Sequence, residues 1–263
     1  MSEIFEIFEK INIRGVNVAN VTLDEAAEIA KSFINNSENN KARAIYTPNA
    51  EMVQACIDDK TGDLFEILNS ADMIIPDGAG VVLASKILKS PLKQKVGGTA
   101  LSCNNIIPYL NEIGGTLFLL GSTEENVEKA VSVLDEQYKN LKVFYNNGFF
   151  NKDKDNAKNE AVIEKINKCA PDVVFVCLGA LGLKQEKWIF ENKDKLNAKL
   201  LMGLGGTIDV IAGVKKYAPK IFIKLNLEWF YYLIKNPSRI GRMMKLPKFV
   251  FGTMFAKKNK NKK

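Results

Sequence analysis

Two short polar segments in the first third of the chain carry groups suited to proton transfer and to ligand hydrogen bonding. Thr47 and Asn49 follow an apolar run at residues 43–46 and place a hydroxyl and an amide where a helix is expected to begin. Asp77 follows the next apolar run, on a Pro-Asp-Gly turn with little side-chain bulk around it. The chain contains no histidine, so a general base must come from another residue type, and a histidine-rich metal site is excluded. The Asp77 carboxylate could serve as that base.

Two further segments of this kind lie later in the chain. Gly121 begins a Gly-Ser turn that could cradle a phosphate, and Gln185 and Glu186 follow the glycine-rich stretch at 178–182. Ligands of parallel α/β sheets gather at the carboxyl ends of the strands, where loops lead into helices. Each segment also has a purely structural interpretation, because an Asn or Asp at such a place can simply cap a helix.

Several other kinds of site are not supported. No G-x-G-x-x-G opens a helix after the first strand, which argues against a dinucleotide oxidoreductase. Asp153 and Asp155 form a D-x-D motif, but it lies in a polar loop rather than at the end of an apolar strand, so we interpret it as a solvated loop. The four cysteines are widely scattered and are expected to be small buried residues. The sequence therefore predicts neither a metal site nor a cofactor.

Short apolar runs alternate with amphipathic stretches along most of the chain. Strands are expected near residues 16–18, 43–46, 72–75, 116–120, 142–145, 173–178 and 199–202. Helices are expected at 22–33, where residues 22–25 form a capping box, and at 50–57, 79–88, 100–113, 124–138 and 156–168. Because the strand runs lack polar alternation, they predict an α/β fold of Rossmann-like type, a mostly parallel sheet with helices on both faces.

The charge is distributed unevenly. Residues 214–263 hold 14 basic side chains and one acidic side chain, whereas the preceding residues hold 23 basic and 29 acidic ones. We therefore divide the chain into a core at 1–218 and a basic, aromatic-rich helical appendage at 219–263. An amphipathic helix there should carry Trp229 and Tyr232 and end at residues 236–237, followed by a short piece from Arg239 and a disordered lysine tail.

Such an appendage suits a helix lying in a membrane interface, since basic and aromatic residues favour that position. The alternative is an ordinary C-terminal helix packed on the core. No run of about 18 uncharged apolar residues occurs, and no signal peptide is evident. The expected location is the cytoplasm, peripheral on the inner face of the membrane, and the exposed apolar surface could drive homo-oligomer formation.

The strand-end segments together resemble the WecG/TagA/CpsF glycosyltransferases, which build bacterial surface polymers such as the linkage unit of wall teichoic acid. The resemblance runs in order from Thr47 to Arg242 and rests on TPNAEMV, ADMIIPDGAGVV, GTLFLLGS, GFF, LGALGLKQEKWI, GLGGTIDVIAG and YAPKIFIKLNLEWFYYLIKNPSRIGR. It implies a metal-independent, inverting transfer of N-acetylmannosamine, or a related sugar, from a UDP-sugar to N-acetylglucosamine linked to undecaprenyl diphosphate. It also implies an appendage that completes the active site at the membrane.

The resemblance further implies a role for each matching residue. Asp77 would be the catalytic base, and Arg239 and Arg242 would face phosphate. The substrate-binding residues would be Thr47, Asn49, Lys95, Gly121, Gln185, Glu186, Gly206 and Asp209. Two arginines could stabilise the departing UDP, because guanidinium groups match phosphate oxygens.

Three positions depart from the pattern of the family. Lys95 stands where relatives usually have arginine, Ala100 where they have an acidic residue, and Tyr232 where they tend to have arginine. The sugar or the acceptor could therefore differ, with UDP-glucose or a UDP-uronic acid as alternative donors. A non-catalytic nucleotide- or nucleic-acid-binding module is the alternative from another class. Because the aromatic residues follow helical spacing, we expect no nucleic-acid partner.

Overall fold

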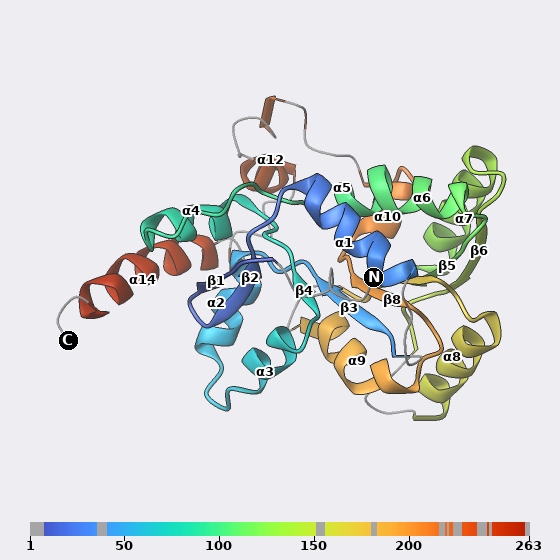
Figure 1. Ribbon diagram of the computed structural model, residues 1–263, viewed down its shortest axis with the longest axis horizontal. Coiled ribbons are helices and arrows are strands. Elements are labelled where there is room, and N and C mark those ends of the chain that lie inside the picture. The colour runs from blue at the N-terminus through green and yellow to red at the C-terminus, as the bar shows by residue number, and fades with distance from the viewer. Residues whose placement is uncertain are drawn as a thin grey trace.

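The computed structural model describes residues 8–35, 41–150, 156–179, 183–215, 219, 221–222, 228–235, 241 and 244–260. A six-stranded, fully parallel sheet forms its centre, with strand order β4-β3-β8-β7-β5-β6 (Figure 1). The strands are β3 (Arg43–Tyr46), β4 (Met73–Ile74), β5 (Thr116–Gly121), β6 (Lys142–Asn146), β7 (Val173–Cys177) and β8 (Leu200–Gly203). The central strands β7 and β8 are buried along their whole length, which explains why their sequences lack polar alternation.

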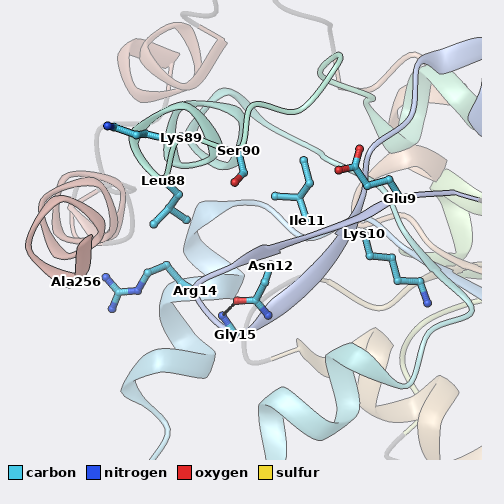
Figure 2. A pocket seen from close by; sticks show the side chains of 10 residues that line it. All are labelled: Glu9, Lys10, Ile11, Asn12, Arg14, Gly15, Leu88, Lys89, Ser90 and Ala256. Carbon is cyan, nitrogen blue, oxygen red and sulfur yellow. Dashed lines mark hydrogen bonds between the residues drawn. The ribbon is translucent and has the colours of Figure 1, made fainter. Parts of the chain in front are cut away.

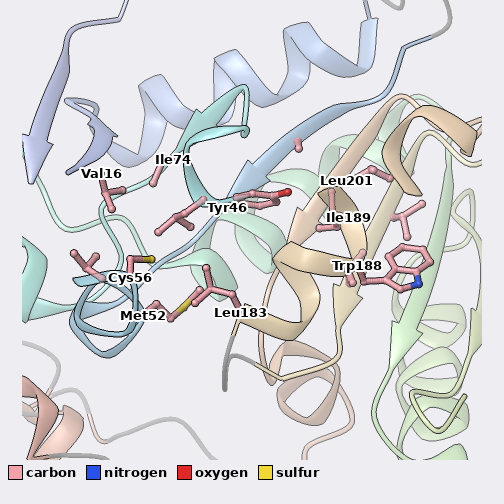
Figure 3. Close-up of a cluster of buried hydrophobic side chains, with 14 of the residues drawn as sticks. Val16, Tyr46, Met52, Cys56, Ile74, Leu183, Trp188, Ile189 and Leu201 are labelled. Carbon is pink, nitrogen blue, oxygen red and sulfur yellow. The ribbon is translucent and has the colours of Figure 1, made fainter. Parts of the chain in front are cut away.

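Two hydrophobic cores lie on opposite faces of the sheet, because successive residues of a strand point to opposite sides. Thus Tyr46 belongs to the first core and Ile45 to the second. The first core, part of which Figure 3 shows, is covered by α2 (Ala50–Asp58), α3 (Asp63–Asn69), α4 (Ala79–Ile87), α8 (Asn156–Cys169) and α9 (Lys184–Asn192). The second core is covered by α1 (Leu23–Asn35), α5 (Gly98–Leu101), α6 (Ile107–Glu112), α7 (Glu124–Gln137) and α10 (Thr207–Ile211). The expected α/β architecture with helices on both faces is confirmed.

Local sequence signals account for several element boundaries. Thr22 and Glu25 form the expected capping box, in which the Glu25 amide donates to Thr22 Oγ1 at 3.2 Å and the Thr22 amide donates to Glu25 Oε2 at 2.8 Å. The stretch expected as one helix at 100–113 is continuous but changes character, with a π-helical segment at Ser102–Ile106 between α5 and α6. A 3₁₀ turn at Lys193–Lys195 extends α9.

The N-terminal strands correct one prediction. Residues 16–18 do form a strand, β2 (Val16–Ala19), but it pairs antiparallel with β1 (Lys10–Ile13) in a separate two-stranded sheet. The sequence predicted no strand at residues 10–13, and residues 16–18 were expected to belong to the parallel sheet. The physical reason is the two-residue connection Arg14–Gly15, which is too short for a parallel crossover and long enough only for a hairpin.

The C-terminal segment corrects a second prediction. In place of a short piece and a disordered tail, helix α14 runs from Lys245 to Lys260. It packs against α2 and α4, and its Phe249 is fully buried in the first core. The alternative of a helix packed on the core therefore holds for α14. Its opposite side exposes Phe251 and Phe255 to about 60% and 63%.

Helix α12 spans Glu228–Lys235, and residues 236–237, where the sequence predicts the end of a helix, lie outside the described residues. The side chains of Trp229 and Tyr232, together with Arg239 and Arg242, lie outside the described residues. Within the described part of the chain, no helix is both long and apolar enough to cross a membrane.

Candidate active site

Part of the sequence-predicted site lies at the carboxyl ends of two neighbouring strands. Tyr46, the last residue of β3, lies opposite Gly203, the last residue of β8. The chain then leads from β3 to α2 on one face of the sheet and from β8 to α10 on the other. Ligands of open α/β sheets bind in the crevice between helices that diverge in this way, so we take the region between α2 and α10 as the candidate crevice.

Thr47 closes the floor of this crevice. Its hydroxyl donates to the carbonyl oxygen of Gly203 at 2.8 Å and ties the end of β3 to the end of β8. Gly98 packs directly on it, since a Cβ on Gly98 would come within 2.7 Å of Thr47 Cγ2. Thr47 is only 8% exposed, so its first role is to hold the two strand ends together.

Asn49 caps the helix that follows β3. Its side-chain oxygen accepts a hydrogen bond from the amide of Met52 at 3.1 Å, which confirms the structural interpretation of this residue. The same side chain lies beside Gly78, whose added Cβ would be 3.5 Å from Asn49 Cβ. The cap therefore also brings the Asn49 amide next to the turn that carries Asp77.

Asp77 does not cap its helix. The N-cap of α4 is Gly78, which has a φ of 83° and makes no side-chain cap. Instead, Asp77 Oδ2 accepts a hydrogen bond from the amide of Gly98 at 3.5 Å, and the residue is half-buried. The amide of Val96 donates to the carbonyl of Pro76 at 3.0 Å, which brings the segment containing Lys95 alongside Asp77.

Gln185 and Glu186 lie behind the crevice rather than in it. Both side chains are buried, with exposed fractions of 1% and 0%. Gln185 Nε2 donates to Glu186 Oε1 at 2.7 Å, and Gln185 Oε1 accepts from the amide of Gly205 at 2.9 Å. These contacts fix the turn at Gly205, next to the predicted substrate residue Gly206.

A second polar cluster surrounds Asp209 at the ends of β5 and β8. Its Oδ1 accepts hydrogen bonds from Ser122 Oγ and, at 3.2 Å, from Asn126 Nδ2. A Cβ on Gly206 would meet Lys215 Nζ at 3.0 Å and Asp209 Oδ2 at 3.7 Å, so the Lys215 ammonium lies over Gly206 beside this carboxylate. Such a combination of hydroxyl, carboxylate and ammonium groups suits a ligand that carries both hydroxyls and phosphates.

Gly121 is required for this cluster to form. Its φ is 138°, and any Cβ would fall 2.3 Å from the carbonyl oxygen of Cys177 on the neighbouring strand. Ser122 follows with a φ of 61°, and its carbonyl accepts from the amide of Gly148 at 2.9 Å. Phe149, beside this turn, exposes 77% of its surface.

The two clusters are joined by a hydrogen bond between threonines. Thr99 Oγ1 and Thr207 Oγ1 are 2.9 Å apart and connect the start of α5, beside Asp77, to the start of α10, beside Asp209. Four residues of these clusters were not predicted from the sequence: Thr99, Thr207, Asn126 and Lys215. Lys215 was counted only among the basic residues of 214–263, because nothing in its neighbourhood in the sequence distinguishes it from the lysines around it.

Four residues discussed from the sequence cannot be placed. Arg239, Arg242, Asp153 and Asp155 lie outside the described residues. In the part of the chain that is described, no three side chains of metal-ligating type converge.

The chain matches one protein family over most of its length and resembles several named proteins of that family. The model of the glycosyl transferase WecG/TagA/CpsF family matches residues 11–263. The chain is 35% identical over 250 residues to N-acetylglucosaminyldiphosphoundecaprenol N-acetyl-beta-D-mannosaminyltransferase of Staphylococcus aureus strain MW2, which covers 95% of this chain and 94% of that protein. The proteins of the same name from strains NCTC 8325 and COL match with the same identity and coverage.

Proposed function

The chain belongs to the WecG/TagA/CpsF family of glycosyltransferases, and from this premise we propose that it transfers N-acetylmannosamine from a UDP-sugar to undecaprenyl-diphosphate-linked N-acetylglucosamine with inversion at the anomeric carbon. The carboxylate of Asp77 carries the proposal. It is half-buried beside Gly98, and the hydrogen bond between Thr99 and Thr207 connects its surroundings to the second polar cluster, around Asp209. The two clusters suit the two substrates of a single displacement.

The proposed reaction is a single displacement. The acceptor hydroxyl oxygen forms a bond to the anomeric carbon of the donor sugar as the bond from that carbon to the UDP oxygen breaks. Asp77 takes the hydroxyl proton, and UDP leaves with the bonding electrons. Arg239 and Arg242 would stabilise the negative charge that develops on the diphosphate, since charge-assisted hydrogen bonds to phosphate are strong.

We assign the donor nucleotide to the cluster around Asp209. Its carboxylate, already bonded to Ser122 and Asn126, can accept hydrogen bonds from ribose hydroxyls, and Lys215 lies close enough to the cluster to meet a phosphate. The exposed ring of Phe149 offers a flat surface on which uracil can stack.

The test of Asp77 is its substitution by asparagine, which keeps the size of the side chain and removes the base. We expect Asp77→Asn to lower kcat by about 100-fold or more, with unchanged thermal stability and unchanged affinity for UDP. Near-normal turnover would move the role elsewhere. Glu186 is the other candidate from the sequence, but its burial behind Gly203 argues against direct contact with an acceptor hydroxyl.

Donor identity and metal dependence are tested in the same assay. A panel of UDP-sugars with a short-chain lipid-diphosphate acceptor should give the highest kcat/KM with UDP-N-acetylmannosamine. Because the resemblance implies an arginine in relatives where Lys95 stands, UDP-glucose and a UDP-uronic acid belong in that panel. Turnover should survive EDTA, and loss of activity that Mg²⁺ restores would contradict the metal-independent mechanism.

We also propose that the outward side of α14 docks on an anionic membrane at its inner face. Phe251, Met254 and Phe255 are spaced by three and four residues and share that side, with exposed fractions of 60%, 48% and 63%. The surplus of basic residues in this segment attracts anionic lipid at about 1 kcal/mol for each residue near the surface. We expect the same side to drive self-association when membrane is absent.

Deleting the whole segment would test docking poorly, because it would also remove Phe249 from the core. The sharper variant changes only exposed side chains: Phe251→Ser, Met254→Gln and Phe255→Ser together. It should lose co-sedimentation with phosphatidylglycerol vesicles and keep its thermal stability. The matched control, Phe144→Ser with Phe190→Ser, removes two rings that are each 42% exposed on other elements. Equal binding of the two variants would rule out docking by α14.

A further inference from the structure

A cavity of about 650 Å³ opens between the β1–β2 hairpin, the end of α4 and α14 (Figure 2). Three basic side chains and one acidic side chain line it, namely Lys10, Arg14, Lys89 and Glu9. It is separate from the active site: α4 begins beside Asp77, and its nine residues span about 13 Å before the chain reaches the cavity.

Arg14 has a left-handed backbone conformation, which is unfavourable for arginine. It is the first residue of the two-residue hairpin turn, with a φ of 55°, and Gly15 follows with a φ of 101°. Two positive φ values are the sign pattern of a type I′ turn, in which asparagine, aspartate or glycine is strongly preferred at the first position. The turn would therefore form more readily with another residue.

Lys89, at the end of α4, also has a left-handed backbone conformation that is unfavourable for its residue type. It follows the C-cap of α4 with a φ of 62°. Its amide donates to the Lys86 carbonyl at 3.0 Å, and the Ser90 amide donates to the Ser85 carbonyl at 3.0 Å, which is the Schellman pattern. Glycine, and next asparagine, is favoured at this position. Two unrelated elements thus place a cation at a left-handed position, and both cations line the same cavity.

One nitrogen of the Arg14 guanidinium is also left without an acceptor in the described part of the chain. This nitrogen, Nη1, is buried and has no hydrogen-bond partner among the residues that the structure describes. It lies against α14 at Gly252, where an added Cβ would approach Nη1 to 3.3 Å. A buried charged donor without an acceptor is unfavourable, so a ligand that supplies oxygen atoms would satisfy it.

We propose that this cavity binds the phosphate of an anionic phospholipid headgroup. Arginine matches phosphate oxygens in geometry as well as in charge. Ile11, Leu88 and Ala256 give the cavity apolar walls, and its volume is in the range of pockets for ligands much larger than a free phosphate. The cavity borders α14, whose outward side is the proposed membrane contact, so the inference rests on that part of the proposed function.

The test uses a lipid that needs no membrane. Dihexanoyl-phosphatidylglycerol, kept below its critical micelle concentration, should bind the wild-type protein in a calorimetric titration. Arg14→Asn with Lys89→Asn should weaken binding about tenfold or more, since one basic residue near an anionic lipid contributes roughly fivefold. The midpoint of thermal unfolding should stay equal or rise, because asparagine suits both left-handed positions.

Lys86→Gln with Lys245→Gln is the matched control, because it removes the same charge from α4 and α14 outside the cavity. It should weaken binding far less. An equal loss in the control, or no binding by the wild-type protein, would overturn the proposal. Inorganic phosphate that binds as tightly as the lipid would also overturn it, as the site would then be one for free anions.

The outcome can be separated from that of the proposed function. Turnover with a water-soluble acceptor should be the same in both double variants, because neither touches the crevice. If the wild-type protein shows no turnover, the proposed transfer is refuted, but the conclusion from the lipid titration is unaffected.

Discussion

Gly97 and Gly98 are neighbours in sequence, but they should respond in opposite ways to the same substitution. A Cβ on Gly97 would make only ordinary contacts, at 3.9 Å from Ala100 Cβ and from Asp77 Oδ1, and the residue has a φ of −80°, which any side chain can adopt. A Cβ on Gly98 would lie 2.7 Å from Thr47 Cγ2 and 3.0 Å from Thr47 Cβ. Thr47 cannot simply turn away, because it is β-branched and its hydroxyl is bonded to Gly203.

The expected magnitude follows from these contacts. Overpacking a well-packed site costs about 1–3 kcal/mol, and losing the Thr47 hydrogen bond would cost a further ~0.5–1.5 kcal/mol. Alanine regains roughly 0.5–1 kcal/mol over glycine in a helix. Gly98→Ala should therefore lower the free energy of unfolding by about 2 kcal/mol and Tm by about 4–8 °C. Gly97→Ala should be neutral or stabilise the protein by up to ~1 kcal/mol.

Urea unfolding of the two single variants and of Gly98→Ala combined with Thr47→Ser provides the measurement. Serine keeps the hydroxyl and removes Cγ2, the atom in closest contact, so the double variant should recover more than half of the lost stability. Equal stability of the two glycine variants would refute the reasoning. A double variant no more stable than Gly98→Ala would show that Thr47 is not the obstacle.

Three further predictions concern other parts of the molecule. Burial raises the pKa of Asp72, but hydrogen bonds from Lys193 and Arg43 outweigh the effect of burial and hold that pKa below its ordinary value. Asp72→Asn should therefore lose roughly 2 kcal/mol near pH 7, and urea titrations should show the gap to the wild-type protein closing as pH falls below about 4, through the lowered pKa. Burial raises the pKa of Cys177 to about 12, so mass spectrometry should find it unlabelled by iodoacetamide at pH 8 until the protein unfolds, whereas the partly exposed Cys169 reacts; similar native rates would contradict this. Phe149→Ala should weaken UDP binding by about 1–3 kcal/mol in a calorimetric titration if the ring stacks on the base, and unchanged affinity would remove it from the site.

The sequence by itself determined the elements and the strand ends. Each strand of the parallel sheet and the helices between most of them were predicted within a few residues, because unbroken apolar runs and helical spacing are local signals. The segments around Thr47, Asp77 and Gly121 could be found for the same reason, since each directly follows a strand. Resemblance added the roles of these residues, which spacing alone does not supply.

Only the tertiary structure decided which side chains meet. The contact from Thr47 to Gly203 joins residues 156 positions apart and depends on the register of β3 against β8, which no local pattern encodes. The same holds for Gly98 beneath Thr47 and for Lys215 over Gly206.

Tertiary structure also decided which side chains are buried. Glu186 has the composition of a site residue but lies fully buried behind a strand, and α14 buries Phe249 while it exposes Phe251 two residues later. A sequence indicates which residues alternate or recur, but the neighbour that covers a given side of a helix is set only when distant segments pack together.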